Sequence, residues 1–324
     1  MSKKRKNIKI ISIILVGLIL ILCSISFYLQ WYSLEAQGNP RGKNLEESYA
    51  YMTSTYPQIK SWADSMFQHQ LFKDTCIQTE DGMLLHALYA YADSLTPKTA
   101  VIVHGYTDNA IRMLHIGYLY HHDLKYNILL PDLRFSGKSE GSHLQMGWND
   151  RKDVLRWMNI ANELFARYNH IDQTKMVVHG ISMGGATTVN VSGEPQQPFV
   201  KCFINDCGFT SVWDEFKGEL KNQFNIPAFP ILHVASWLTD LRYGWNFKEA
   251  APLKQIRKCK YPMLIIHGAN DTFVPTWMGD SLYQAKPGIK EYWKTPNTEH
   301  AASYRNYPQE YTQRVKNFTE KFLN

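Results

Sequence analysis

The sequence predicts an α/β fold in which helices cover both faces of a mostly parallel β-sheet. From residue 76 onward, strand patterns and helix patterns alternate along the chain. The strand segments are short and apolar almost throughout, which is typical of strands buried on both faces. The chain has 324 residues, 44% hydrophobic and 20% charged. This composition is ordinary for a globular protein and excludes a disordered chain or a fibre.

Residues 1–32 predict a basic tip followed by a membrane anchor. Residues 10–29 form an almost unbroken apolar run without charge, and a helix of that length spans about 30 Å, the hydrocarbon core of a bilayer. A cleaved signal peptide is the alternative, but its apolar region is usually about 7–15 residues and ends in small residues. This run ends in aromatic residues instead. Five basic residues precede it: Lys3, Lys4, Arg5, Lys6 and Lys9.

This charge distribution predicts a single-pass protein of the cytoplasmic membrane. Its N-terminus lies inside, because positive charge stays on the cytoplasmic side, and its body lies outside. The basic tip also accounts for most of the net charge of +6, since the rest of the chain holds 30 basic and 29 acidic residues. A nearly neutral body offers no electrostatic surface for nucleic acid, so we expect no nucleic-acid partner.

Residues 33–73 predict a linker followed by amphipathic helices. Residues 37–43 are polar and contain glycine and proline, as linkers do. Apolar residues then recur every three or four positions from Leu45 to Met66, with Pro57 dividing the pattern into two helices. We expect these helices to pack against the body of the protein.

Residues 74–324 predict the α/β domain. The expected strands are residues 76–78, 84–91, 99–104, 127–132, 175–180, 200–205, 261–267 and 291–294, and the expected helices include 111–123, 149–168 and 309–323. Residues 211–253 break the alternation, because they are rich in aromatic residues and are divided by Pro227 and Pro230. They predict a helical lid over the carboxyl edge of the sheet, or alternatively two ordinary helices with a long loop.

The strongest chemical motif is Gly180-Ile181-Ser182-Met183-Gly184. It follows a predicted strand and precedes a predicted helix, the setting in which G-x-S-x-G holds a nucleophilic serine on a tight turn. A serine hydroxyl needs a base, and the base needs an orienting group. His300 and Asp271 follow the last two strands, at the sheet edge where Ser182 emerges. Asp206, after the strand at 200–205, is the alternative acid.

Negative charge that develops on the substrate requires two backbone N–H donors. Met183, directly after the serine, is expected to supply one. The other is expected from the segment after the third strand, with Tyr106 preferred and Thr107 as the alternative. No HExxH motif and no zinc spacing occurs among the histidines and cysteines. We therefore expect no metal and no cofactor.

Together, these motifs resemble the α/β-hydrolase superfamily, most closely bacterial membrane-anchored serine hydrolases of the esterase or lipase type. The resemblance also includes residues 104–107, 271–275 and 300–304, and it runs from about Asp74 to the C-terminus. Residues 132–139 resemble the family's loop after its fourth strand, with Phe135 where glycine is commoner. The resemblance implies an eight-stranded sheet with an antiparallel second strand, a lid after strand six and no cofactor.

The predicted activity is hydrolysis of carboxylic esters through an acyl-enzyme intermediate. The aromatic lid predicts a small-molecule substrate with an apolar acyl or aryl group. A serine peptidase or amidase is the first alternative, which an acidic residue placed to bind a free amine would favour, and the sequence identifies no such residue. A non-catalytic binding module on the same fold is the second alternative.

Overall fold

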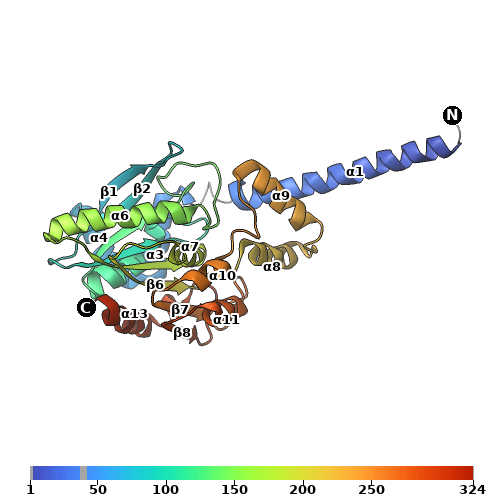
Figure 1. The fold of residues 1–324 in the computed structure, drawn as a ribbon. Helices are drawn as coiled ribbons and strands as arrows, with labels where there is room; N and C mark the ends of the chain where they lie inside the picture. The colour runs from blue at the N-terminus through green and yellow to red at the C-terminus, as the bar shows by residue number, and fades with distance from the viewer. Residues whose placement is uncertain (1–2, 37–41, 324) are drawn as a thin grey trace.

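A computed structural model describes residues 3–36 and 42–323 and places an eight-stranded sheet at the centre of the molecule (Figure 1). The strand order is β1-β2-β4-β3-β5-β6-β7-β8. Strand β2 runs antiparallel to both neighbours, and every other pairing is parallel. The predicted sheet is thus confirmed. Its strands are β1 (Lys73–Gln78), β2 (Leu84–Ala90), β3 (Lys98–Val103), β4 (Asn127–Pro131), β5 (Lys175–Ile181), β6 (Val200–Asp206), β7 (Met263–Gly268) and β8 (Lys290–Thr295).

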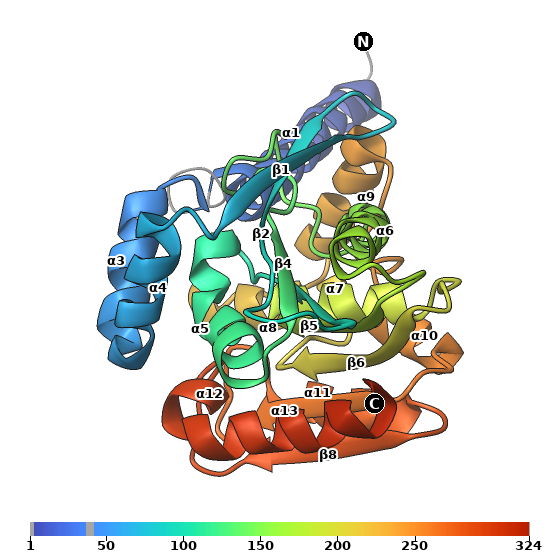
Figure 2. The same cartoon turned by 90° about the vertical axis from the view of Figure 1, so that its left-hand side faces the viewer.

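Helices cover both faces of the sheet (Figure 2), which explains why inner strands such as β4 and β7 are apolar and buried, whereas the edge strands β1 and β8 are more polar. Successive residues of a strand point to opposite faces. In β3, Val101 and Val103 enter a hydrophobic cluster on one face, and Ala100 and Ile102 enter a second cluster on the other. The helices that contribute to the clusters or connect the strands are α3 (Leu45–Thr55), η2 (Pro57–Ile59), α4 (Lys60–Gln68), η3 (Ala110–Met113), α5 (Leu114–Tyr118), η4 (Leu119–Asp123), α6 (Asp150–Asn169), α7 (Met183–Ser192), α10 (Pro252–Gln255), η5 (Ile256–Lys258), α11 (Thr276–Ala285), α12 (Ser303–Asn306) and α13 (Pro308–Leu323).

The amphipathic segment before the sheet forms helices on both sides of its proline. Helix α3 ends at Thr55, and Pro57 takes the first position of η2, where its missing N–H costs nothing. Met52 and Ile59 are buried in the cluster that this segment shares with the body. Most of the expected linker, residues 37–41, lies outside the described residues.

Two helices follow β6 and stand apart from the sheet, α8 (Val212–Phe224) and α9 (Ile231–Tyr243) (Figure 1). Ser211 caps α8 by accepting a hydrogen bond from the Asp214 N–H at 3.0 Å. Left-handed residues end both helices, Asn225 after α8 and Gly244 after α9. We refer to residues 212–243 as the lid helices.

The N-terminal helix α1 (Lys3–Trp31) extends far beyond the body, and η1 (Tyr32–Ala36) continues its path (Figure 1). Within the described residues, this is the one helix long and apolar enough to cross a membrane, by length and composition. Its last turns are packed against lid helix α9: the Gln30 amide donates to Thr239 Oγ1 at 3.0 Å, and Ser26 Oγ donates to the Ile231 carbonyl at 3.1 Å. The helix end is therefore part of the folded body.

Candidate active site

Ser182 lies on a sharp turn between β5 and α7. Its φ of 57° and ψ of −122° are rarely adopted by residues other than glycine. The flanking glycines make this turn possible. A Cβ on Gly180 would lie 2.0 Å from the Gly184 carbonyl oxygen, and a Cβ on Gly184 would lie 2.1 Å from the Val103 oxygen. The chain can therefore turn here only with glycine at both positions.

The structure brings His300 and Asp271 to Ser182 in one hydrogen-bonded chain. The His300 Nε2 lies 2.8 Å from Ser182 Oγ, and its Nδ1 lies 2.7 Å from Asp271 Oδ2. Asp271 follows β7 and His300 follows β8. The carboxyl ends of parallel strands share one edge of the sheet, which brings residues distant in sequence into contact.

The Asp271 carboxylate is held firmly in its orientation. Its Oδ1 accepts hydrogen bonds from the N–H groups of Phe273 at 3.1 Å and Val274 at 2.9 Å. Burial raises the pKa of Asp271, but hydrogen bonds from His267 and His300 outweigh this effect and hold the pKa below its ordinary value. Asp271 is therefore ionised at neutral pH and orients His300.

Asp206, the alternative acid, has a different partner. Its Oδ2 accepts a hydrogen bond from the Tyr311 hydroxyl at 2.8 Å, and its Oδ1 has no partner among the described residues. Burial raises the pKa of Asp206 to about 6, although the Tyr311 hydrogen bond lowers it in part. Its backbone also supports the serine turn, because its carbonyl accepts from the Ser182 N–H at 2.8 Å.

The segment after β3 passes directly beside the serine. A Cβ on Gly105 would lie 3.5 Å from Ser182 Cβ. Tyr106 and Thr107 follow, and both line the same cavity as Ser182 and Met183. Both expected residues thus lie in the cavity that contains Ser182, and Tyr106 remains the predicted donor of the second N–H.

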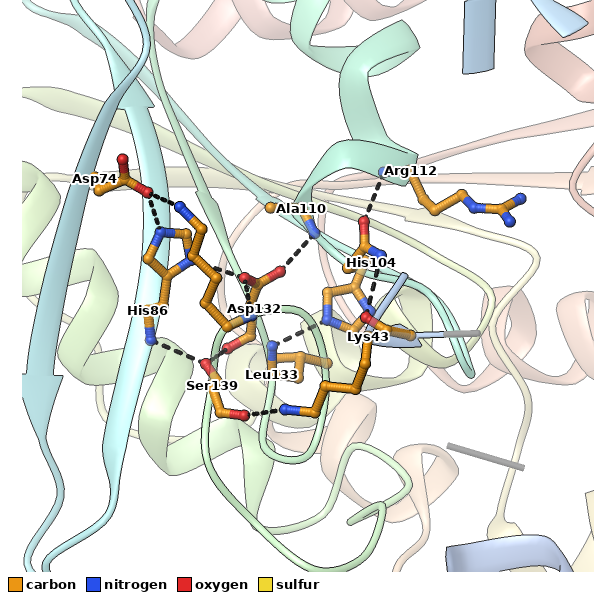
Figure 3. A network of polar contacts seen from close by, with 12 residues as sticks. Lys43, Asp74, His86, His104, Ala110, Arg112, Asp132, Leu133 and Ser139 are labelled. Carbon is orange, nitrogen blue, oxygen red and sulfur yellow. Dashed lines mark hydrogen bonds and ion pairs between the residues drawn. The ribbon is translucent and has the colours of Figure 1, made fainter. Parts of the chain in front are cut away.

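A buried polar network holds this segment in place (Figure 3). Asp132 Oδ1 accepts from the Ala110 N–H at 2.7 Å, and His104 Nε2 accepts from the Leu133 N–H at 2.9 Å. His86 lies 2.7 Å from Asp132 Oδ2 and 2.6 Å from Asp74 Oδ1. Residues 132–139 thus fix the segment that carries Tyr106.

The unusual residue of this loop, Phe135, has a backbone φ of 65°. This is the left-handed region that favours glycine. Phe135, which stands where the family's loop more often has glycine, is therefore a site of backbone strain. The network of Figure 3 braces the loop that contains it.

A cavity of about 320 Å³ opens onto Ser182. Lid residues such as Phe216 and Leu232 form much of its apolar wall, and Leu29 of α1 and Tyr32 of η1 also contribute. The sequence predicts an aromatic lid at this edge of the sheet, but it does not predict that α1 contributes to the cavity. The apolar run at residues 10–29 has the length and composition of a membrane span, and this pattern does not indicate that one end of the helix lines a cavity.

Two acidic residues of α8, Glu215 and Glu219, also line the cavity. Neither residue was predicted from the sequence as an acid of the substrate pocket. Charged residues four positions apart on an amphipathic helix are usually exposed. The spacing of Glu215 and Glu219 therefore predicts an exposed pair, whereas Glu215 is only 5% exposed.

Cys207 lies beside the serine, where its thiol, Asp271 and His300 are within 4.8 Å of one another. This grouping has the compactness of a metal site. However, burial and the charges of Asp206 and Asp271 raise the pKa of the thiol well above its ordinary value. A neutral thiol is a poor metal ligand, and both nitrogens of His300 already have hydrogen-bond partners. The donor set therefore does not fit a metal, and the expected absence of one remains a prediction.

Comparisons with known proteins agree with this fold. Residues 118–324 match the model of the prolyl oligopeptidase family, Peptidase_S9. The chain is 30% identical over 259 residues to the uncharacterized protein YqkD of Bacillus subtilis, an alignment that covers 78% of this chain and 83% of YqkD.

Two solved structures share the fold at lower identity. The esterase Pf2001 of Pyrococcus furiosus has a TM-score of 0.59 and 22% identity, over 78% of this chain and 93% of the esterase. The acylaminoacyl peptidase of Pyrococcus horikoshii has a TM-score of 0.53 and 20% identity, over 80% of this chain and 43% of the peptidase. The sheet order, the serine turn and these matches together mean that the chain is an α/β hydrolase that belongs to the prolyl oligopeptidase family.

Proposed function

We propose that the protein is a serine hydrolase that cleaves carboxylic esters through an acyl-enzyme intermediate. The observation that carries this proposal is the chain of hydrogen bonds from Ser182 through His300 to Asp271 at 2.8 and 2.7 Å. These distances are the ones required for a nucleophile, its general base and the group that orients the base.

In this mechanism, Ser182 Oγ attacks the ester carbonyl while His300 Nε2 takes its proton. The N–H groups of Met183 and Tyr106 stabilise the negative charge on the carbonyl oxygen. His300 then gives the proton to the departing alcohol, and the acyl group remains on Ser182. Water repeats the sequence and releases the acid. Asp271 keeps Nδ1 protonated and stabilises the imidazolium throughout.

The cavity supports a substrate with an apolar acyl or aryl group. Its wall is built mainly from aliphatic and aromatic side chains of the lid helices and α1. Peptide or amide cleavage is the alternative, since the family includes peptidases and the same residues can attack amides. The two carboxyl groups in the cavity favour this alternative only where a substrate carries an amine.

The protein is further proposed to be anchored in the cytoplasmic membrane by α1. The exposed apolar side chains of the outer part of α1 support this placement. Trp237 and Leu241 of α9 are 58% and 70% exposed, on the lid helix that packs along α1. Apolar residues next to an anchor are suited to the membrane interface.

The test is hydrolysis of a panel of p-nitrophenyl esters and aminoacyl anilides by wild-type protein and Ser182→Ala. Ester turnover should fall by roughly 10⁴–10⁶ in the variant, by analogy with other triads. Butyryl ester should be preferred to succinyl ester, because the cavity wall is mainly apolar. A folded Ser182→Ala that retains turnover within tenfold of wild type would exclude the mechanism. Faster cleavage of anilides than of esters would favour the amidase.

A further inference from the structure

The cavity beside Ser182 is lined by a carboxyl group of which one oxygen has no hydrogen-bond partner among the described residues. Glu215 lies on the first turn of α8, lines the cavity and is 5% exposed. Its Oε2 atom has no hydrogen-bond partner among the described residues. Leaving a buried carboxyl group unpaired costs free energy, so this group requires an explanation.

Among the described residues that line the cavity, none carries a positive charge that could compensate for it. The described residues that line the cavity include Glu215 and Glu219 but no lysine, arginine or histidine. Glu219 lies one turn further along α8, about half-buried, and accepts a hydrogen bond from the Gln223 amide. The charged groups that act most strongly on Glu215 are Glu219, Asp271 and Asp214. The electrostatic potential at Glu215 therefore favours a cation.

The same two carboxyl groups lie close to the reacting residues. Glu215 experiences the charge of Asp271, and Glu219 experiences that of His300. A group bound at Glu215 would thus sit in the same cavity as an acyl group on Ser182. The remaining wall near Glu215 is apolar, with Phe216, Leu220 and Leu232 among its residues.

We propose that Glu215, assisted by Glu219, binds a protonated amine of the substrate. The substrate class is then an ester or amide of a hydrophobic amino acid with a free amino group. The apolar wall would hold the amino acid's side chain, and the carboxyl groups would hold its ammonium. This inference rests on the proposed function, because it assigns the substrate of the same Ser182 site.

Burial raises the pKa of Glu215 well above its ordinary value, with Glu219 adding to the effect. Burial of an unpaired carboxyl group favours its neutral form over its charged form. When an ammonium binds, the carboxyl group releases its proton and forms a charge-assisted hydrogen bond. A substrate without an amine cannot form this bond.

The test compares leucine benzyl ester with benzyl 4-methylpentanoate, which lacks only the α-amine, and with N-acetylleucine benzyl ester, which lacks the charge. The readout is the ratio of kcat/KM between the amine-bearing ester and each neutral ester. Comparing this ratio between a variant and the wild type cancels the different intrinsic reactivities of the esters. In Glu215→Gln the ratio should fall about 10- to 100-fold relative to wild type, as expected for loss of a hydrogen bond to a charged group. Asp240→Asn, an exposed carboxylate of α9 outside the cavity, should leave the ratio at the wild-type value.

Glu219→Gln provides a second variant, at a half-exposed position, and should lower the ratio in the same direction. Ratios within threefold of wild type in folded Glu215→Gln and Glu219→Gln would overturn the inference. If Glu215→Gln does not fold, Glu219→Gln decides alone. A parallel loss on all three esters would also overturn it, because it would mean that Glu215 is only structural.

A binding measurement separates this inference from the proposed function. Leucinamide should raise the melting temperature of wild-type protein, whereas 4-methylpentanamide at the same concentration should raise it less. The difference should vanish in Glu215→Gln. If none of the esters is hydrolysed in a Ser182-dependent manner, the proposed function fails, and this measurement still decides the amine site. Equal stabilisation by the two amides would overturn it.

Discussion

Asp271 and Asp206 follow neighbouring strands, yet they have different environments. Asp271 accepts hydrogen bonds from two backbone N–H groups and from His300. Asp206 accepts one from Tyr311, and its second oxygen is unpaired. Both aspartates could be identified in the sequence as candidate acids, because each lies at the end of a predicted strand. The partner of each depends on side-chain directions that only the packed sheet defines.

This difference predicts a ranking of two isosteric substitutions. Asp271→Asn should lower ester turnover about 10³–10⁴-fold, because the amide cannot hold the required tautomer of His300. Asp206→Asn should lower turnover only modestly, since the Asn oxygen can still accept from Tyr311. The measurement is kcat/KM on one ester with folded protein. The reverse ranking would make Asp206 the catalytic acid.

The raised pKa of Asp206 predicts a pH-dependent stability. Its pKa is about 6 in the folded chain, against an ordinary value of 3.8. The folded state therefore binds this proton more tightly than the unfolded chain does. Below about pH 4 Asp206 is protonated in both states, and its ionisation does not affect the free energy of unfolding. Between about pH 4 and about pH 6 the free energy of unfolding falls, because the unfolded chain releases this proton first. Above about pH 6 the loss stays constant at about 3 kcal/mol, the value for two pKa units.

The amide that replaces the carboxyl group in Asp206→Asn cannot ionise, so the variant should not show this loss of unfolding free energy. The measurement is the free energy of unfolding by denaturant at pH 4.5 and pH 7.5, for wild type and variant. The variant should gain stability relative to wild type on going to pH 7.5, whereas Asp240→Asn should not. Equal pH dependence in wild type and Asp206→Asn would show that Asp206 is not a buried acid of raised pKa.

At the scale of elements, the strands were the most predictable part. Most of them are short apolar runs, although the edge strands β1 and β8 are largely polar. The sheet that they form has the expected number of strands and the expected antiparallel β2. The role of α1 was not predictable. Its apolar residues have the pattern of a membrane anchor, and nothing in that pattern reveals that Gln30 is buried against Thr239 or that Tyr106 donates to the Ser33 carbonyl at 2.5 Å.

This packing predicts how truncation affects the protein. A chain that begins near Leu34 loses Leu29, Gln30 and Tyr32, and with them one wall of the cavity and a partner of α9. A chain that begins near Ile25 keeps these contacts. The longer chain should have the higher melting temperature and the higher kcat/KM on an apolar ester. Equal values for the two chains would mean that the end of α1 does not support the lid.

At the scale of the whole molecule, the basic tip and α1 predict the topology. The tip should stay in the cytoplasm, because positive residues resist translocation, and residues 42–323 should lie outside. Full-length protein should sediment with membranes, and protease added outside intact spheroplasts should digest the body. Protection of the body under conditions where an external marker protein is digested would reverse the topology.

We propose that Ser182 is a nucleophile activated by His300 and Asp271, and covalent labelling tests this role most directly. A fluorophosphonate probe should label the wild-type chain, and mass spectrometry of its peptides should locate the adduct on Ser182. Labelling should be lost in Ser182→Ala and slowed in Asp271→Asn, while Asp240→Asn should label at the wild-type rate. An unlabelled, folded wild-type chain, or an adduct on a residue other than Ser182, would contradict the account.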